Sequence, residues 1–268
     1  MAAMPTVLAL MAHPDDAEIL CGGTLLVLAG AGWKIHIATM TAGDCGSSTL
    51  GPQEIARVRR AEGARAASIL GGEFHCLEHK DLEVFYERES LGRACSLLRR
   101  VEPDVVITHS PCDYMLDHEE TSRVARAACF NAPIPNAPAA DGSVPIRAIP
   151  ALYYADPVEG VDALGRPIPP RFVVDVADVV ERKAAALACH SSQREWLRAQ
   201  HGIDEYLDSM RSWGAERGRL AGVEHGEGFR QHLGHAYPRE DRLRAALGAR
   251  VHALCDEPER PSTPERKR

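Results

Sequence analysis

The sequence predicts a single α/β domain in which a Rossmann-like, mostly parallel sheet is covered by helices on both faces. The chain has 268 residues, 45% of them hydrophobic, which is enough to bury one large core. Apolar strand-like runs alternate with helix-like segments over about the first 110 residues, a pattern typical of a parallel sheet. Polar residues follow two of these runs directly, and such sheets bind ligands at the carboxyl ends of their strands. We therefore expect the active site at that edge.

The predicted strands are short apolar or alternating runs that end in turn-forming residues. The first run ends at a His-Pro-Asp-Asp turn, and the second (KIHIATM) alternates in character. The run DVVIT after Pro103 has the most convincing composition for a buried strand, and three weaker runs complete the set. The six strands are expected at residues 7–11, 34–40, 73–77, 104–108, 151–156 and 172–176.

The predicted helices have apolar residues at helical spacing and recognisable ends. Leu20, Leu25 and Leu28 lie roughly on one face of the first helix, and the second helix ends at a Gly-Gly pair, a strong stop signal. The six helices are expected at residues 18–31, 52–70, 89–101, 121–130, 179–190 and 196–217. Tyr206, in the last of them, is expected to pack in the core.

Residues 131–150 hold five prolines together with Asn and Gly, which predicts a loop. A loop of this length beside an active edge is typical of a wall of the substrate site. We find no internal repeat and no linker-like boundary, so we interpret residues 1–256 as one domain. Residues 257–268 (EPERPSTPERKR) are expected to form a disordered tail.

The charge balance and the cysteine pattern argue against several classes of protein. The chain has 31 Lys and Arg against 38 Asp and Glu, a net charge of −7, so nucleic acid is not an expected partner. No apolar stretch approaches the about 20 residues that span a bilayer, so no membrane is expected either. The N-terminal residues lack the features of a secretory signal, and the eight cysteines include no Cys-x-x-Cys pair. We expect a cytoplasmic protein with reduced thiols. The sequence does not decide between a monomer and a homo-oligomer.

The first chemical motif is the turn at residues 12–18 (AHPDDAE), between the first strand and the first helix. His13 and Asp16 offer an imidazole nitrogen and a carboxylate oxygen from one turn, and zinc accepts both ligand types. Pro14 stiffens the turn, and Asp15 lies between the two ligands. The alternative is that Asp15 or Asp16 only caps the helix, where carboxylates are favoured. A cap, however, explains neither the histidine nor the second aspartate.

The second motif, residues 113–120 (DYMLDHEE), follows a later predicted strand and contains His118 flanked by acids. Alone, such a histidine is typical of a surface residue. Together with His13 and Asp16 it completes a set of two imidazoles and one carboxylate with a position left for water. That is the ligand set of a catalytic hydrolytic zinc site. Since both motifs follow strands, we expect them at the same edge of the sheet.

The turn AHPDD at residues 12–16 heads a series of short segments in a recognisable order. The other segments are residues 22–24 (GGT), 41–46 (TAGDCG), 59–62 (RRAE), 190–193 (HSSQ) and 226–229 (GEGF). In these segments the chain resembles the LmbE/PIG-L family of zinc-dependent N-acetylglucosaminyl deacetylases, from about residue 6 to about residue 230. The family's AHPDDE signature is altered here, because Ala17 is inserted before Glu18.

The resemblance implies a hydrolase that removes an N-acyl group, in the simplest case N-acetyl, from a small-molecule amino-sugar conjugate of the glucosamine type. It implies that His13, Asp16 and His118 bind the metal. The implied cofactor is Zn²⁺, with Fe²⁺ or another divalent metal as alternatives. Asp15 would be the general base that deprotonates a metal-bound water, and the resulting hydroxide would attack the acyl carbonyl.

One position departs from the family's second motif, D-Y-H-P-D-H. Met115 stands where the family's first histidine is thought to stabilise the oxyanion, and Leu116 replaces the proline. A thioether donates no hydrogen bond, and losing an oxyanion donor costs about 10²–10³ in rate. Tyr114 and His190 are the candidate replacements, and the metal acting alone is a third. An alternative is that Met115 widens the acyl pocket for a bulky substrate.

Two further residues are assigned to substrate binding, with alternatives left open. Arg59 could bind a substrate phosphate or sugar oxygen, or form an ordinary salt bridge with Glu62 on its helix. Asp117 is expected to orient a group of the site, or to be a surface carboxylate. The alternative functions are an amidase of a thiol-sugar conjugate and a non-catalytic sugar-binding protein. A nucleotide-binding Rossmann enzyme is disfavoured, because no G-x-G-x-x-G follows the first strand.

Overall fold

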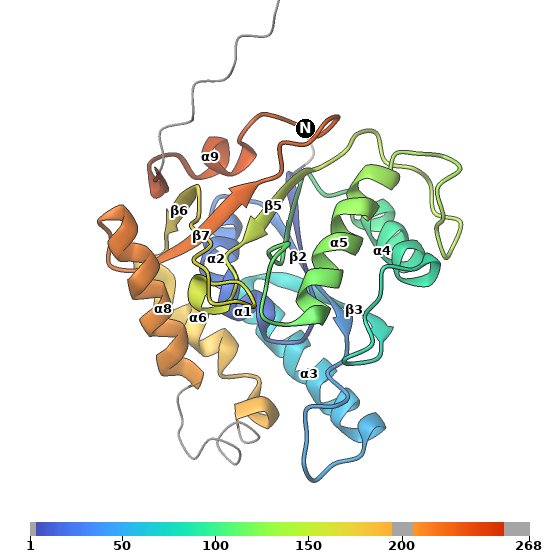
Figure 1. The fold of residues 1–268 in the computed structure, drawn as a ribbon, viewed down its shortest axis with the longest axis horizontal. Coiled ribbons are helices and arrows are strands. Elements are labelled where there is room, and N and C mark those ends of the chain that lie inside the picture. Colours follow the sequence, from blue (N-terminus) through green and yellow to red (C-terminus); the bar gives the residue numbers. More distant parts are fainter. Residues whose placement is uncertain (1–3, 195–205, 255–268) are drawn as a thin grey trace, which may run out of the picture.

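The computed structural model describes residues 4–194 and 206–254, whose centre is one eight-stranded mixed sheet (Figure 1). Across the sheet the strands follow the order β3-β2-β1-β4-β5-β7-β6-β8. The first five pair in parallel, whereas β7, β6 and β8 join by antiparallel pairing. The strands are β1 (Thr6–Met11), β2 (Lys34–Thr41), β3 (Gly72–His79), β4 (Val105–Thr108), β5 (Ala151–Ala155), β6 (Phe172–Asp175), β7 (Gly226–Gln231) and β8 (Val251–Ala253).

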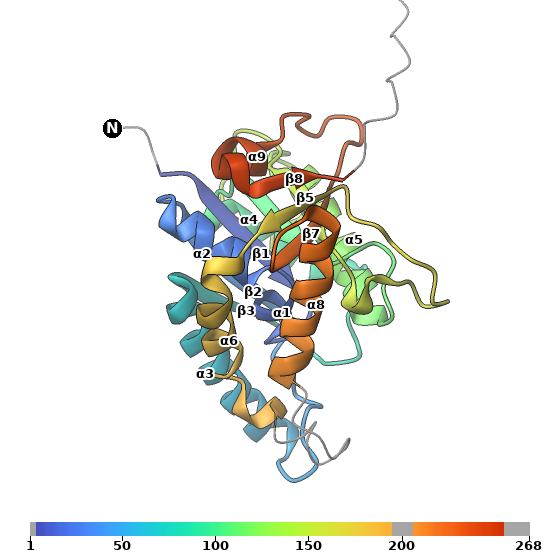
Figure 2. The ribbon, with the colours of Figure 1, turned by 90° about the vertical axis from the view of Figure 1, so that its left-hand side faces the viewer.

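Helices cover both faces of the sheet (Figure 2). One hydrophobic cluster packs between the sheet and α1, α2, α3, α6 and α9, and a second packs between the sheet and α4 and α5. The α-helices are α1 (Asp16–Leu20), α2 (Gly22–Gly30), α3 (Pro52–Leu70), α4 (Arg88–Val101), α5 (Leu116–Asn131), α6 (Val180–Leu187), α8 (Tyr206–Ala221) and α9 (Arg242–Leu247). Short 3₁₀ helices are η1 (Val158–Gly160), η2 (Ala177–Val179) and η3 (Gly248–Arg250). Within the described part of the chain, no helix has the length and apolar character needed to cross a membrane.

The predicted fold class is confirmed, and the six predicted strands lie within a few residues of their expected bounds. The predicted helix at 18–31 is instead two helices, because the backbone turns at Cys21 (φ −145°, ψ 9°). The sequence pattern does not predict β7, β8 or α9. β7 contains Gly226 and Gly228, and glycine is depleted in strands. Residues 196–205 of the last predicted helix and the predicted tail at 257–268 lie outside the described residues.

The proline-rich segment 131–150 lies at the edge of the sheet opposite the candidate site, so its expected role as a substrate wall is wrong. Helix α5 starts at the carboxyl edge and runs back about 24 Å, which returns the chain to the amino edge. There Ala151, the first residue of β5, pairs with Val105, the first residue of β4. The buried Arg99 of α4 fixes the segment by donating hydrogen bonds to the carbonyls of Ala132, Ile134 and Ser143.

A buried carboxylate fastens the start of α2 to β7. Glu227 accepts hydrogen bonds from the backbone N–H groups of Gly23 (2.8 Å) and Thr24 (2.7 Å). It also pairs with Lys183 Nζ at 2.7 Å, and both charged side chains are almost fully buried. Gly23 is needed here, because an added Cβ would lie 2.7 Å from the Cβ of Val176. This contact joins the GGT and GEGF segments of the sequence.

Lys183→Met is expected to lower the free energy of unfolding by about 3 kcal/mol, because removing one partner of a buried ion pair leaves an uncompensated charge. Urea denaturation measures the loss. Arg182→Met, at the exposed neighbouring position, is the matched control and should change the free energy by less than about 0.5 kcal/mol. A loss of less than about 1 kcal/mol in Lys183→Met would mean that the two backbone donors suffice for Glu227.

Candidate active site

The turn after β1 and the start of α5 bring both chemical motifs to the carboxyl edge of the sheet. His13 precedes α1, Asp16 is the first residue of α1, and His118 lies in the first turn of α5. One ligand atom of each side chain lies within 4.8 Å of the other two. All three side chains are buried. The structure therefore brings together the three residues that the sequence proposes as metal ligands.

Two buried aspartates hold the imidazoles of this cluster. Asp117 Oδ2 lies 3.1 Å from His13 Nε2, and Asp113 Oδ1 lies 3.0 Å from His118 Nδ1. The opposite nitrogens, His13 Nδ1 and His118 Nε2, face the Asp16 carboxylate at 3.4 and 3.5 Å. A carboxylate behind an imidazole fixes the orientation of the ring and leaves the other nitrogen available to a cation. Asp113 is part of the second motif, but the sequence pattern does not single it out.

The pKa shifts in the cluster favour positive charge within it. Burial lowers the pKa of His13, but hydrogen bonds with Asp117 and Asp16 outweigh burial and raise this pKa to about 10. Burial alone would raise the pKa of Asp16, yet His118 and His109 hold it well below its usual range. The charge of Asp16 likewise raises the pKa of His118, against the effect of burial. The acidic groups thus form a buried site suited to a cation.

His109 is a third imidazole of the cluster, and the sequence pattern does not assign it to the site. It is fully buried, and its ring stacks on that of His118 with the centroids 3.9 Å apart. His109 Nε2 lies 3.1 Å from Asp16 Oδ2 and 3.0 Å from the backbone nitrogen of Ala12. The signal that could have found it is its position, because it directly follows β4 as the first motif follows β1.

Asp15 has a backbone conformation that residues other than glycine rarely adopt, with φ 109°. Such strain costs on the order of 1–3 kcal/mol and is concentrated at functional sites. The Asp15 side chain makes no capping hydrogen bond to α1. It accepts a hydrogen bond from the hydroxyl of Tyr206 at 2.6 Å. Tyr206 packs against a small hydrophobic cluster, as expected, but the start of α8 also carries its hydroxyl to the turn, which the sequence does not predict.

Arg59 is buried under the same turn. Its guanidinium donates hydrogen bonds to the carbonyls of Pro14 (2.7 Å) and Gly43 (3.4 Å), and it lies 3.5 Å from Asp15 Oδ2. Gly43 (φ 72°) leaves space for this group, because an added Cβ would lie 2.1 Å from an Arg59 nitrogen. Burial raises the pKa of Asp15, and the charge of Arg59 partly opposes the effect. The contacts of Arg59 are thus with the turn that carries Asp15.

The two candidate hydrogen-bond donors lie at different depths. His190 is fully buried, and its Nε2 lies 3.5 Å from the carboxylate of Glu18. Tyr114 is 57% exposed, and its ring meets that of His118 edge-on with the centroids 5.3 Å apart. Partial desolvation of its side chain and the charge of Asp16 raise the pKa of Tyr114. The phenol therefore stays protonated and able to donate a hydrogen bond.

Met115 lies beside the cluster as the N-cap residue that precedes α5. Its carbonyl accepts hydrogen bonds from the backbone N–H groups of His118 (3.1 Å) and Glu119 (3.2 Å). Its half-buried side chain has no hydrogen-bond donor to offer. Met115 therefore helps to place His118 through its backbone.

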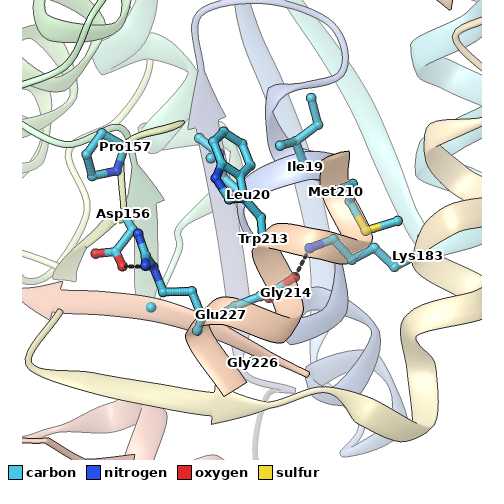
Figure 3. Close-up of a pocket in the computed structure, with 12 residues that line it drawn as sticks. Ile19, Leu20, Asp156, Pro157, Lys183, Met210, Trp213, Gly214, Gly226 and Glu227 are labelled. Carbon is cyan, nitrogen blue, oxygen red and sulfur yellow. Dashed lines mark hydrogen bonds and ion pairs between the residues drawn. The ribbon is translucent and has the colours of Figure 1, made fainter. Parts of the chain in front are cut away.

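A small cavity lies between α1, α8 and β7 (Figure 3). Two ion pairs border it, Arg217 with Asp156 and Lys183 with Glu227, each at 2.7 Å. Its volume of about 30 Å³ accommodates about one or two water molecules and is too small for a sugar ring. We therefore assign no substrate to it.

Comparison with known proteins agrees with the motifs. Residues 8–129, which include both motifs, match the family described as PIG-L: GlcNAc-PI de-N-acetylase. The chain contains a PIG-L/LmbE family domain. The resemblance that the sequence motifs indicate is thus confirmed.

Individual relatives of this chain differ in their named reactions. It is 28% identical over 235 residues to a diacetylchitobiose deacetylase of Thermococcus kodakarensis, covering 84% of this chain and 82% of that protein. It is 27% identical over 199 residues to a 4-oxalmesaconate hydratase of Pseudomonas putida, covering 70% of this chain and 74% of that protein. The solved N,N'-diacetylchitobiose deacetylase of Pyrococcus horikoshii superposes with a TM-score of 0.72 at 27% identity, covering 88% of each chain.

Proposed function

We propose that this chain is a metal-dependent hydrolase that removes an N-acyl group, in the simplest case N-acetyl, from an amino sugar of the glucosamine type. The observation that carries the proposal is the buried cluster of His13, Asp16 and His118, whose ligand atoms lie within 4.8 Å of one another next to Asp15. Two of the similar proteins described above carry the name of a diacetylchitobiose deacetylase, which supports an N-acetylated sugar as the substrate class.

The donor set of the cluster fits a divalent cation. Two imidazole nitrogens and a carboxylate oxygen are ligands that Zn²⁺ accepts, and Fe²⁺ or another divalent metal accepts the same set. The raised pKa of His13 supports the fit, because the surrounding carboxylates already favour positive charge at this position. When bound, the ion would polarise the acyl carbonyl and lower the pKa of a water molecule.

Asp15 is the residue that we assign to proton transfer. Its carboxylate would accept a proton from the attacking water and donate it to the departing amine, so that a C–O bond forms as the amide C–N bond breaks. Tyr206 and Arg59 would position this carboxylate, the first by its 2.6 Å hydrogen bond and the second by holding the turn. The raised pKa of Asp15 suits a group that takes up a proton.

Tyr114 is the better placed of the two candidate donors to the oxyanion, because it is exposed beside His118 and its hydroxyl stays protonated. His190 lies deeper, and we assign to it an electrostatic effect, since its charge lowers the pKa of Asp15. Met115 would line the acyl pocket. Asp117 would act on the substrate only through the imidazole of His13 that it holds.

The decisive experiment incubates the metal-loaded protein with N-acetylglucosamine, N,N'-diacetylchitobiose and glycosides of N-acetylglucosamine. Free amine and released acetate are both quantified, and we expect equal amounts of the two. Amine release from thiol-sugar conjugates alone would identify the amidase alternative. Saturable binding of the sugars with no amine release at any metal loading would identify a non-catalytic binding protein.

Hydration of a carbon–carbon double bond is the second candidate function, supported by the 27% identity to 4-oxalmesaconate hydratase. The lack of a donor at Met115 is compatible with this reaction, which breaks no amide bond. Incubation with 4-oxalmesaconate, followed by ultraviolet absorbance, tests it. Consumption of this acid without amine release from any N-acetyl sugar would replace the deacetylase proposal.

Asp117→Asn is expected to weaken metal binding by about 10–100-fold, because the carboxylate that orients His13 is replaced by a neutral amide. Competition with a chromophoric chelator measures the affinity. Glu120→Gln is the matched control on the same helix, since its carboxylate bonds the backbone of Tyr86 and lies outside the cluster. Equal metal affinity in both variants would argue against a role of Asp117 behind the ligand.

A further inference from the structure

A second group of metal-ligating side chains lies on β2 and on β3, the strand at the edge of the sheet. His36 is close to the start of β2, and Glu73 and His75 are in the first half of β3. His36 pairs with Glu73 and Ala38 pairs with His75, so the three side chains project from the same face of the sheet. One ligand atom of each lies within 4.8 Å of the others. The group occupies the amino half of the strands, whereas the candidate active site is at the carboxyl edge.

The two imidazoles already have nearly the spacing of ligands of one ion. His36 Nδ1 lies 3.0 Å from His75 Nε2, and the stacked rings have centroids 5.3 Å apart. Two nitrogens that bind one zinc ion tetrahedrally at about 2.0–2.1 Å are about 3.3 Å apart. Glu73 Oε2, at 3.9 Å from His36 Nδ1, supplies a carboxylate on the same side. A small widening of the imidazole pair is therefore enough to admit an ion.

The protonation of the pair also suits a metal. One of the two facing nitrogens, His36 Nδ1 or His75 Nε2, carries a hydrogen that it donates to the other. An ion can replace this hydrogen if each ring carries its proton on the nitrogen that faces away from the pair. Two cations act on the pair: Lys34 on His36, and Arg100, which is paired with Asp141, on His75.

We propose that His36, Glu73 and His75 bind a divalent transition-metal ion at a site separate from the active site, and that the ion ties the edge strand β3 to β2. Two imidazoles and one carboxylate suit Zn²⁺, Ni²⁺ or Cu²⁺, whereas Mg²⁺ and Ca²⁺ prefer oxygen ligands alone. The Glu73 side chain is 76% exposed, which leaves the ion open to water on that side. Because the site exists only when β2 and β3 are paired, the bound ion stabilises the folded sheet.

Equilibrium dialysis of the untagged full chain against Zn²⁺ tests the stoichiometry. We expect two ions per chain in the wild type and one in either His36→Gln or His75→Gln, both with wild-type catalytic activity. Asp16→Asn should keep one ion, and Asp16→Asn with His75→Gln should keep none. His252→Gln, on the opposite edge strand β8, is the matched control and should bind as many ions as the wild type.

Electron paramagnetic resonance of Cu²⁺ identifies the ligands. In the Asp16→Asn chain we expect coupling to two imidazole nitrogens, reduced to one by His36→Gln. Glu73→Gln, at a side chain that is 76% exposed, should weaken Zn²⁺ binding at this site and reduce the rise in melting temperature on adding Zn²⁺. Undiminished Zn²⁺ stoichiometry in His36→Gln and His75→Gln would overturn the proposal and leave a hydrogen-bonded histidine pair. This stoichiometry does not depend on whether the active site deacetylates sugars.

Discussion

His118→Ala is expected to abolish metal binding at the candidate active site and to lower deacetylation by about 10³-fold or more. His118 supplies one of the three ligand atoms, and the charge stabilisation that a metal supplies is worth several kcal/mol, about 1.36 kcal/mol for each factor of ten in rate. The substitution also removes the partner of Asp113, which lies 3.0 Å from His118 Nδ1. Atomic absorption, which should show one metal ion per chain fewer than in the wild type, and amine release, measured on one preparation, test both losses.

His252→Ala controls for the loss of an imidazole elsewhere in the sheet, because His252 lies on the edge strand β8. It should keep both the metal and the rate. Wild-type activity in a His118→Ala protein without metal at the active site would contradict metal-dependent hydrolysis. If the variant kept the active-site metal but lost activity, His118 would not be a metal ligand and would have another role in the reaction.

The fold could be predicted as far as it depends on local sequence pattern. β4 is completely buried and reads as an apolar, β-branched run. The bounds of α3 agree with the prediction, because Pro52 and Gly71 mark its two ends locally. β7 could not be predicted, since Gly226 and Gly228 give no strand signal. Its conformation comes from pairing with β5 and β6, which lie far from it in sequence.

In the candidate site, too, the contacts between residues close in sequence could be predicted, and the contacts between distant residues could not. His13 and Asp16 lie in one turn, and a hydrogen bond from the His13 backbone to the Asp16 carboxylate (2.7 Å) shows how local this arrangement is. Tyr206, by contrast, reaches Asp15 from 191 positions away. That contact depends on how α8 packs beside α1, and no periodicity within α8 encodes it. Short sequence motifs therefore cannot identify a residue such as Tyr206, which supports the site from a distant helix.

The strain at Asp15 links the fold to the proposed chemistry. A positive φ is unfavourable for aspartate, so the surrounding contacts must hold the turn in place. The structure supplies them through Arg59, which bonds the Pro14 carbonyl, and through the Tyr206 hydroxyl. Both contacts orient the carboxylate of Asp15 rather than bury more apolar surface. This arrangement is typical of a group whose position matters for function.

Asp15→Asn is expected to lower kcat by about 10²–10⁴-fold, the usual contribution of a general acid–base group, with metal content unchanged. Asparagine has the same shape, tolerates positive φ, and can still accept the hydrogen bond of Tyr206. Its amide cannot take up a proton at neutral pH, so proton transfer is removed, together with the charge that faces Arg59 at 3.5 Å. Steady-state kinetics, metal analysis and urea denaturation of the same preparation measure the three properties.

Asp208→Asn, an exposed acid on α8 close to Tyr206 in sequence, is the matched control and should keep the wild-type rate. If Asp15→Asn kept more than about a tenth of the wild-type kcat, proton transfer would belong to another group. Loss of metal together with the rate would make Asp15 a determinant of the metal site instead. Lost turnover with intact active-site metal separates Asp15 from His118, whose replacement should remove the active-site metal and turnover together.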